Sequence, residues 1–178
     1  MDDKVFKGFL QRQRVDGCEL AAQSDILRLR PLEESLPRHY VAEFRCRGVV
    51  RQRDGRMGEG GLFAVGVFFP DDYLRRAASS EVLTWFHPDT VFHPNILGSA
   101  AAICIGRLQP GTNLVDILYQ VYEIIVYHKW NSLEYDSLNP AACAWARANQ
   151  NRFPTDPRPL RRPRFVAAAA AAGKEAAP

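Results

Sequence analysis

A single cysteine, Cys104, lies near the end of a stretch whose residue types suit nucleophilic chemistry. The stretch, Val91–Ile105, contains the tripeptide His93-Pro94-Asn95, then Gly98, Ser99 and three alanines before the thiol. Small side chains leave the backbone near a thiol uncrowded, which suits a nucleophile that must meet a bulky partner. Because sulfur both attacks a thioester well and leaves well, a cysteine in this setting predicts acyl exchange.

The motifs on either side of Cys104 follow a recognisable order. Two apolar, strand-like segments, Leu62–Phe69 and Val82–Phe86, precede the tripeptide and are separated by Pro70-Asp71-Asp72-Tyr73. After the thiol come a turn, a long amphipathic helix, and Asp136-Ser137-Leu138-Asn139-Pro140. This order resembles the ubiquitin-conjugating enzyme family over roughly residues 5–153. It looks closer to the compact bacterial members than to the eukaryotic ones.

The resemblance implies a thioester mechanism. Cys104 would accept the C-terminal carboxyl group of a ubiquitin-like modifier from an activating enzyme and pass it to an amine of a target protein. Asn95 would either stabilise the oxyanion or hold the loop. His93 would orient the turn through hydrogen bonds rather than act as a base. Asp136 matches the acidic position that helps an incoming lysine lose its proton, although it is equally read as a loop aspartate before a helix.

The implied partners are a ubiquitin-activating-type enzyme, a ubiquitin-like modifier protein and a target protein, with no cofactor. Bacterial members are typically encoded beside an activating enzyme, a ubiquitin-like protein and a JAB-type metalloprotease. Antiphage defence is the role this implies for some of them. The chain departs from the family after Tyr73, where Leu74-Arg75-Arg76-Ala77 replaces the usual prolines. This departure falls on a surface that helps to meet activating enzymes and ligases.

Two other functions remain compatible with these residues. One is an inactive binding module of the same fold that only presents a modifier or partner. The other is a Cys-His hydrolase, for which His87, His93 and His128 are available. Hydrolases of that class often place their cysteine at the start of a helix, and no cysteine here has that position.

Composition excludes several classes of protein. The net charge of +3 comes from nineteen arginines and four lysines against twenty acidic residues. A nucleic-acid binder would show a denser basic stripe interleaved with aromatic residues, so we expect no nucleic-acid partner. The four cysteines have no regular spacing, which argues against a disulfide framework and a zinc or other metal site. No apolar stretch is long enough for a signal or membrane span, so we expect a cytoplasmic protein without membrane contact.

The elements that must position Cys104 predict an α+β fold with two parts. Residues 1–153 would form a ubiquitin-conjugating-like domain, in which an antiparallel meander sheet packs against an N-terminal helix and a central crossover helix. Residues 154–178 would form a tail rich in proline and alanine.

The local patterns give bounds for these elements. An N-terminal helix would be capped by Asp2 or Asp3, bury Val5, Phe6, Phe9 and Leu10, and end or break at Asp16-Gly17. Lys4, Lys7, Arg12 and Arg14 would form its outer face, which in the family meets the activating enzyme. After an extended lead-in over residues 24–32, a strand would run over residues 39–50, followed by a glycine-rich loop over residues 51–61 with its turn at Asp54-Gly55. Asn113 with Asp116 would cap a helix that repeats through His128, and Asn139-Pro140 would begin a last helix to about Asn151.

Overall fold

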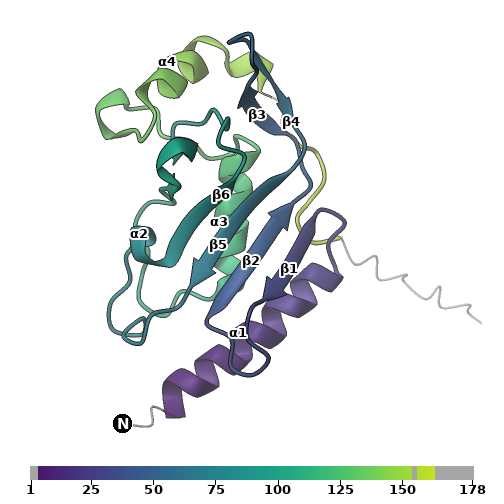
Figure 1. Ribbon diagram of the computed structural model, residues 1–178, viewed down its shortest axis with the longest axis vertical. Coiled ribbons are helices and arrows are strands. Elements are labelled where there is room, and N and C mark those ends of the chain that lie inside the picture. The colour runs from purple at the N-terminus through teal and green to yellow at the C-terminus, as the bar shows by residue number, and fades with distance from the viewer. Residues whose placement is uncertain (1–3, 154–155, 163–178) are drawn as a thin grey trace, which may run out of the picture.

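The protein has an α+β fold built on one antiparallel sheet (Figure 1). The computed structural model describes residues 4–153 and 156–162. Four strands form the sheet in the order β1 (Leu27–Pro31), β2 (His39–Phe44), β5 (Phe63–Phe68) and β6 (Leu83–His87). Every neighbouring pair is antiparallel, which confirms the predicted meander. The strands therefore follow the order of the chain, with one excursion between β2 and β5.

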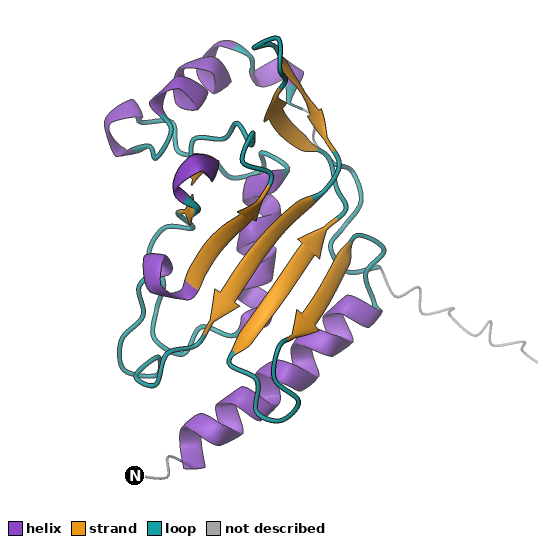
Figure 2. Cartoon of the chain, viewed as in Figure 1, coloured by secondary structure: helices purple, strands orange, loops and turns teal. Residues whose placement is uncertain are grey.

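The rest of the described chain forms helices and two short hairpins beside this sheet (Figure 2). Within the described residues the α-helices are α1 (Lys4–Ala22), α2 (Ser79–Val82), α3 (Leu114–Ile125) and α4 (Pro140–Ala148). Single turns of 3₁₀-helix occupy Gly98–Ala100, Glu134–Asp136 and Gln150–Arg152. Strands β3 (Gly48–Arg51) and β4 (Met57–Gly60) form one hairpin, and β7 (Ile96–Leu97) and β8 (Ala102–Ile103) form another.

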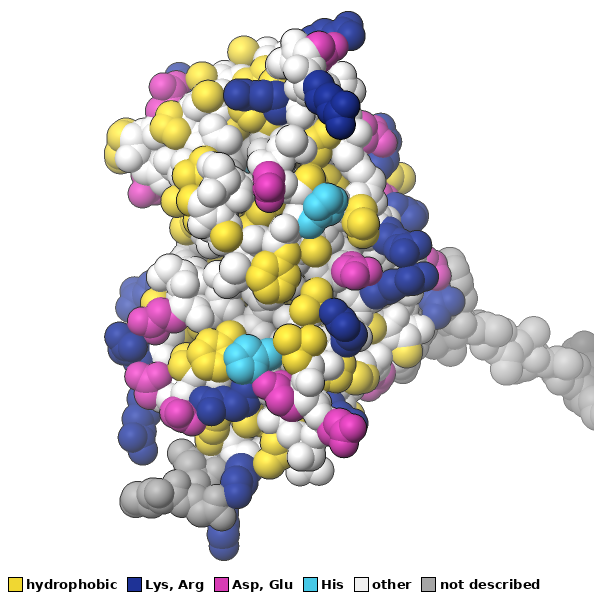
Figure 3. Space-filling model, in the orientation of Figure 1, with side chains coloured by type: hydrophobic (Ala, Val, Ile, Leu, Met, Phe, Trp, Pro, Cys, Tyr) yellow, Lys and Arg dark blue, Asp and Glu magenta, His cyan; other side chains and the backbone are white. Residues whose placement is uncertain are grey.

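The main core lies between the sheet and helices α1 and α3, which contact each other on the same face (Figure 1). Alternate residues of β2 point into this core, because Tyr40, Ala42 and Phe44 are buried. The opposite face of the sheet presents a mixture of hydrophobic and charged side chains to the viewer (Figure 3). One helical layer therefore covers one face of one sheet.

Helix α1 continues through Asp16-Gly17, so the predicted end at this turn signal is wrong. Gly17 is buried, and a Cβ built there would lie 2.8 Å from a methyl carbon of Leu114 and 2.8 Å from one of Leu29. The glycine is therefore explained by close packing of α1 against α3 and β1 rather than by a turn. Val5 was also assigned wrongly to the buried stripe, because its side chain is 72% exposed.

The N-terminus of α3 confirms its predicted cap. The Asn113 side chain accepts a hydrogen bond from the Asp116 amide at 2.8 Å, and its own amide donates to the Asp116 carboxylate at 2.7 Å. Gln13 of α1 accepts a further hydrogen bond from the Leu114 amide at 2.6 Å. A buried glutamine thus satisfies an otherwise unpaired amide of the helix N-terminus and fixes α1 against α3. The helix ends at Ile125, so His128 lies beyond it, contrary to the predicted repeat.

The segment predicted as one strand over residues 39–50 divides into β2 and β3. The chain turns away from the sheet after Phe44, and the Arg45 amide donates to the Ile26 carbonyl at 2.7 Å. Strand β3 then pairs with β4, which lies in the segment predicted as loop, while Asp54-Gly55 forms the expected turn, with Gly55 at φ +82°. Cys46, between the two strands, is buried as predicted.

Residues 156–162, which the sequence assigned to the tail, pack on the core. Asp156 is 1% exposed and accepts hydrogen bonds from the Arg47 amide and from the Arg158 guanidinium. Leu160 is buried in the main core, and the Arg162 amide donates to the Gln23 carbonyl at 2.8 Å. Contacts with the domain therefore extend beyond residue 153. The rest of the predicted tail (154–155 and 163–178) and the predicted cap at Asp2 or Asp3 lie outside the described residues.

Candidate functional site

The β7–β8 hairpin brings Asn95 next to Cys104. Its register pairs Ile96 with Ile103 and Leu97 with Ala102, so the next step outward places Asn95 opposite Cys104. The Cys104 amide donates to the Asn95 carbonyl at 2.8 Å, which extends the pairing to these two residues. Nine positions apart in the chain, the two predicted site residues are therefore held side by side by backbone hydrogen bonds.

The side chain of Asn95 adds a second link to the cysteine. Its Nδ2 donates to the Cys104 carbonyl at 2.9 Å, and its Oδ1 accepts from the Asn131 amide at 2.7 Å. The residue is 8% exposed. Because one amide hydrogen and the carbonyl oxygen are already engaged, this geometry makes Asn95 the residue that holds the Cys104 loop against the segment after α3. The second Nδ2 hydrogen has no hydrogen-bond partner among the described residues.

His93 is a buried positioning residue. It is 1% exposed, and its Nδ1 accepts a hydrogen bond from the Asn95 amide at 3.0 Å. Burial lowers the pKa of His93 to about 3, so the ring is neutral near pH 7 with its proton on Nε2. The ring lies against Tyr127, with centroids 4.2 Å apart. This arrangement fits the predicted role of orienting the turn and does not expose a base to a substrate.

Asp136 connects to the same network from the exposed side. The Asn131 side chain donates to the Asp136 carbonyl at 2.9 Å and to its carboxylate at 3.1 Å. The backbone amide of Asn131 is the group that binds Asn95, so one residue links the predicted carboxylate to the cysteine loop. Asp136 itself is exposed, and Leu138, two residues further on, lines the same groove as Cys104.

Two further contacts fix the ends of this loop. The Pro94 carbonyl accepts hydrogen bonds from the Ser137 hydroxyl at 2.9 Å and from the Asn139 amide at 3.2 Å, which ties the tripeptide to the start of α4. Asn139 caps α4 as predicted, because its side chain accepts from the Ala142 amide at 3.1 Å. Helix α4 in turn contributes to a second small core around Phe92 and Tyr127.

Lys129 fixes the residue that follows the cysteine. Its ammonium group donates to the Ile105 carbonyl at 2.8 Å and to the Gln120 side chain at 3.3 Å. Two successive carbonyls are thus held, that of Cys104 by the Asn95 side chain and that of Ile105 by the Lys129 ammonium group. Sequence reasoning identified neither Lys129 nor Asn131, because no local pattern distinguishes them from ordinary polar residues after a helix.

Cys104 lines an open groove with a volume of about 940 Å³. The groove lies between the β7–β8 loop, α2 and the loop that follows the cysteine, and the half-buried residue Cys104 forms part of its wall. An indentation is visible above α2 at the left edge of Figure 3. A partner chain can therefore reach the part of the wall that Cys104 forms. The other three cysteines differ in setting: Cys46 and Cys143 are buried, and Cys18 is exposed on α1.

All four histidines lie among the described residues, and none of them hydrogen bonds to the Cys104 thiol. Two of these, His87 and His128, are exposed, and His39 binds Glu33. The geometry therefore supplies no Cys-His pair of the kind a cysteine hydrolase uses. In the described part of the chain no group of three histidine, cysteine or acidic residues has a metal-binding arrangement.

Within residues 4–153 and 156–162, no helix combines the length and the apolar composition that a membrane span needs. Comparison with protein-family models gives no match to this chain, and comparison with curated proteins gives none either.

Proposed function

We propose that the protein is a ubiquitin-conjugating-type transferase that carries a ubiquitin-like modifier as a thioester on Cys104. The observation that carries this proposal is that Cys104 is half-buried in the wall of an open groove, where the side-chain amide of Asn95 donates to the Cys104 carbonyl. The motif order of the sequence and the antiparallel α+β fold agree with such an enzyme. The fold alone would be compatible with many functions, so the site bears the argument.

The proposed reaction has two balanced steps. In the first, the Cys104 thiolate attacks the carbonyl carbon of a modifier thioester on an activating enzyme. The cysteine of the activating enzyme leaves as a thiol and takes up the proton that Cys104 lost. In the second, an amine of the target attacks the new thioester, the carbon–sulfur bond breaks, and Cys104 regains its thiol. Fixed positioning of the two reactants lowers the barrier in both steps.

The residues around the thiol would divide the work as follows. The Asn95 carbonyl and side chain hold the amide and the carbonyl of Cys104, and Lys129 holds the carbonyl of Ile105, so that the backbone around the thiol is fixed. Asp136 stands on the exposed side of the network, where a carboxylate can accept a proton from an incoming amine. His93 remains neutral and supports the turn from beneath.

The experiment that tests this proposal is thioester formation with an activating enzyme and ubiquitin-like protein from the same gene neighbourhood, in the presence of ATP. We expect an adduct that disappears on addition of a thiol reductant. A Cys104→Ser variant should give an adduct that resists the reductant, because an oxyester replaces the thioester. A Cys18→Ser variant is the matched control and should load normally, since that exposed thiol lies on α1.

The same experiment separates the alternatives. An inactive binding module would associate with the modifier but form no covalent adduct. A hydrolase would release free modifier without accumulating an adduct. Loading that survives in the Cys104→Ala variant would remove Cys104 from the mechanism.

A further inference from the structure

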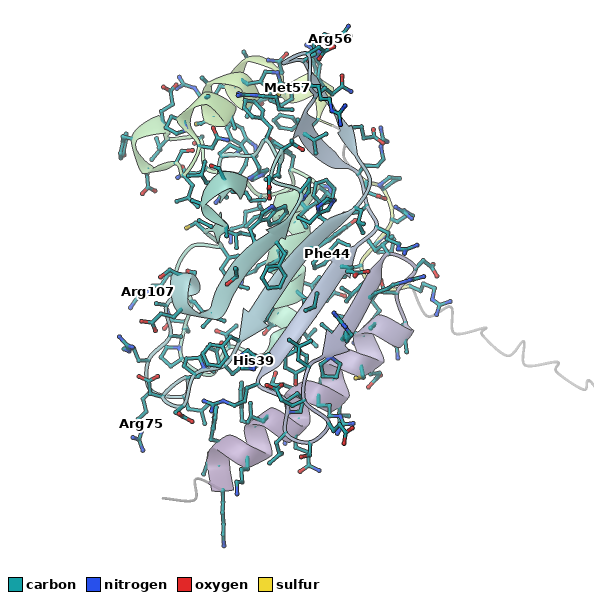
Figure 4. The ribbon with its side chains drawn as sticks, in the orientation of Figure 1. His39, Phe44, Arg56, Met57, Arg75 and Arg107 are labelled. Atoms are coloured by element: carbon teal, nitrogen blue, oxygen red, sulfur yellow. The ribbon has the colours of Figure 1, made fainter. Side chains whose placement is uncertain are left out.

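The groove that Cys104 lines carries uncompensated positive charge. Three arginines line it and no acidic residue does. Arg76 pairs with two carboxylates, those of Asp72 and Glu81, each at 3.2 Å, so the three arginines and these two acidic side chains leave a net charge of +1. Arg75 and Arg107 have no ion pair within the described residues and are exposed. Figure 4 shows both side chains at the same edge of the molecule, with Arg75 on a loop below Arg107 in this view.

Small residues make up much of the groove's wall around Cys104 and before α2. Ala77 and Ala78 lie before α2, and the three alanines Ala100–Ala102 and Gly106 lie around the thiol. Leu83, Ile103 and Leu108 are buried beneath them. These small side chains leave room for an extended backbone, and the arginines at the rim then favour the side chains of opposite charge that this backbone carries.

A guanidinium group prefers a carboxylate as its partner, because the two form parallel charge-assisted hydrogen bonds. We propose that the groove receives the extended C-terminal segment of the carrier protein, and that this segment has acidic side chains upstream of its activated carboxyl group, which pair with Arg75 and Arg107. This inference rests on the proposed function and specifies its substrate. The positively charged rim would disfavour a segment with basic residues at the same positions.

Synthetic peptide thioesters test this specificity without any partner enzyme. Two short peptides would share a glycine C-terminus and a small thiol leaving group, and would differ only in having glutamates or lysines upstream. The Cys104 thiolate attacks the peptide carbonyl, the bond to the small thiol breaks, and that thiol leaves with a proton. Intact-mass measurement followed by peptide mapping gives the rate at Cys104 and, as an internal reference, at the exposed Cys18.

We expect the acidic peptide to load Cys104 about fivefold faster than the basic one at low salt, from two partly exposed ion pairs. The preference should shrink as salt screens these charges. An Arg75→Glu, Arg107→Glu double variant should prefer the basic peptide, and the corresponding double variant to glutamine should show no preference. The matched control is Arg30→Glu, since Arg30 is exposed on β1 at the opposite edge of the sheet. It should retain the preference of the unmodified protein.

Equal loading of the two peptides at Cys104 would overturn the inference and leave the proposed function standing. A preference that persists in the double glutamate variant would overturn it as well. If no peptide loads Cys104 faster than Cys18, the proposed function itself fails, because the groove then does nothing for the thiol.

Discussion

Replacement of Asn95 by alanine tests the residue on which the geometry of the site depends. The side chain makes two partly buried hydrogen bonds: its Nδ2 donates to the Cys104 carbonyl, and its Oδ1 accepts from the Asn131 amide. Each is worth about 1 kcal/mol, and each leaves a partner unpaired when it is lost. Because Cys104 and Asn131 are both half-buried, water can reach the freed groups and the penalty stays near its lower limit. We therefore expect Asn95→Ala to lower the free energy of unfolding by about 2–3 kcal/mol.

Urea denaturation measures this change as a lower midpoint with an unchanged slope, a shift on the order of 1 M. Asn151→Ala is the matched control, because Asn151 is exposed and its side chain makes no hydrogen bond among the described residues. It should change stability by less than about 0.5 kcal/mol. An Asn95→Ala protein as stable as this control would refute the claim that the amide holds the cysteine loop.

Asn95→Asp refines the same prediction. The introduced carboxylate can still accept from the Asn131 amide but turns an acceptor toward the Cys104 carbonyl. At neutral pH the variant should be no more stable than Asn95→Ala. Lowering the pH should improve it relative to Asn95→Ala, because a protonated carboxyl group can donate to that carbonyl. An Asn95→Asp protein with the stability of the unmodified chain at pH 7 would show that the Nδ2 donor is unimportant.

Three further predictions concern the elements that support the site. Gly17→Ala should destabilise the protein by about 1–2 kcal/mol, because its Cβ would lie 2.8 Å from carbons of Leu114 and Leu29. In the same helix, the Cβ of Gly8→Ala meets no atom within 4 Å, so this variant should stabilise the protein by up to about 1 kcal/mol. Urea midpoints of the two variants that move in the same direction would contradict this prediction. Burial lowers the pKa of His93 to about 3, well below its value of about 6.5 in the unfolded chain. The free energy of unfolding should therefore fall as the pH is lowered from 6.5 toward 3, by up to about 1.4 kcal/mol per pH unit. When this free energy is measured by urea denaturation from pH 4 to 7, it should depend less steeply on pH in His93→Gln; an equal dependence on pH would be inconsistent with a neutral buried ring. Hydrogen bonding to Arg158, opposed by burial, lowers the pKa of Asp156 to about 2. This carboxylate therefore contributes stability that is complete above about pH 4 and is lost as the pH falls toward 2. Asp156→Asn should lower the free energy of unfolding by about 2 kcal/mol at pH 7 and by little at pH 2, whereas a loss that does not depend on pH would point to packing alone.

The parts of the fold that sequence predicted well are those whose pattern is local. The apolar run of β5 and the Asn113 cap of α3 are both specified by neighbouring residues, and both are confirmed. The same holds for Asn139 before Pro140 at the start of α4. In each case the residues that decide the structure are close to one another in the sequence, within one helical turn or one strand.

The errors arise where distant contacts override a local signal. Gly17 looks like a helix terminator in isolation, yet it is required where α1 approaches Leu114, almost a hundred positions away in the chain. The hairpin of β3 and β4 replaces a predicted strand and loop, since Phe92 and Val49 hydrogen bond across a long separation. Tertiary packing decides such positions, and a local pattern does not contain it.

The candidate site shows the same division. The thiol and the tripeptide could be identified from residue types, and the register of β7 and β8 explains why they meet. Asn131 and Lys129 could not, because their roles depend on where the chain returns after α3. A polar residue after a helix becomes a site residue only when a distant loop is folded against it.

The most direct test of the central claim is a single-turnover discharge of the loaded protein. The Cys104 adduct would be formed, ATP removed, and free lysine added, with the products followed by mass. We expect the adduct to disappear as a modifier–lysine conjugate accumulates. The mass of this conjugate should exceed that of the free modifier by the mass of one lysine minus one water. Release of free modifier alone, at a rate that does not depend on lysine, would contradict it.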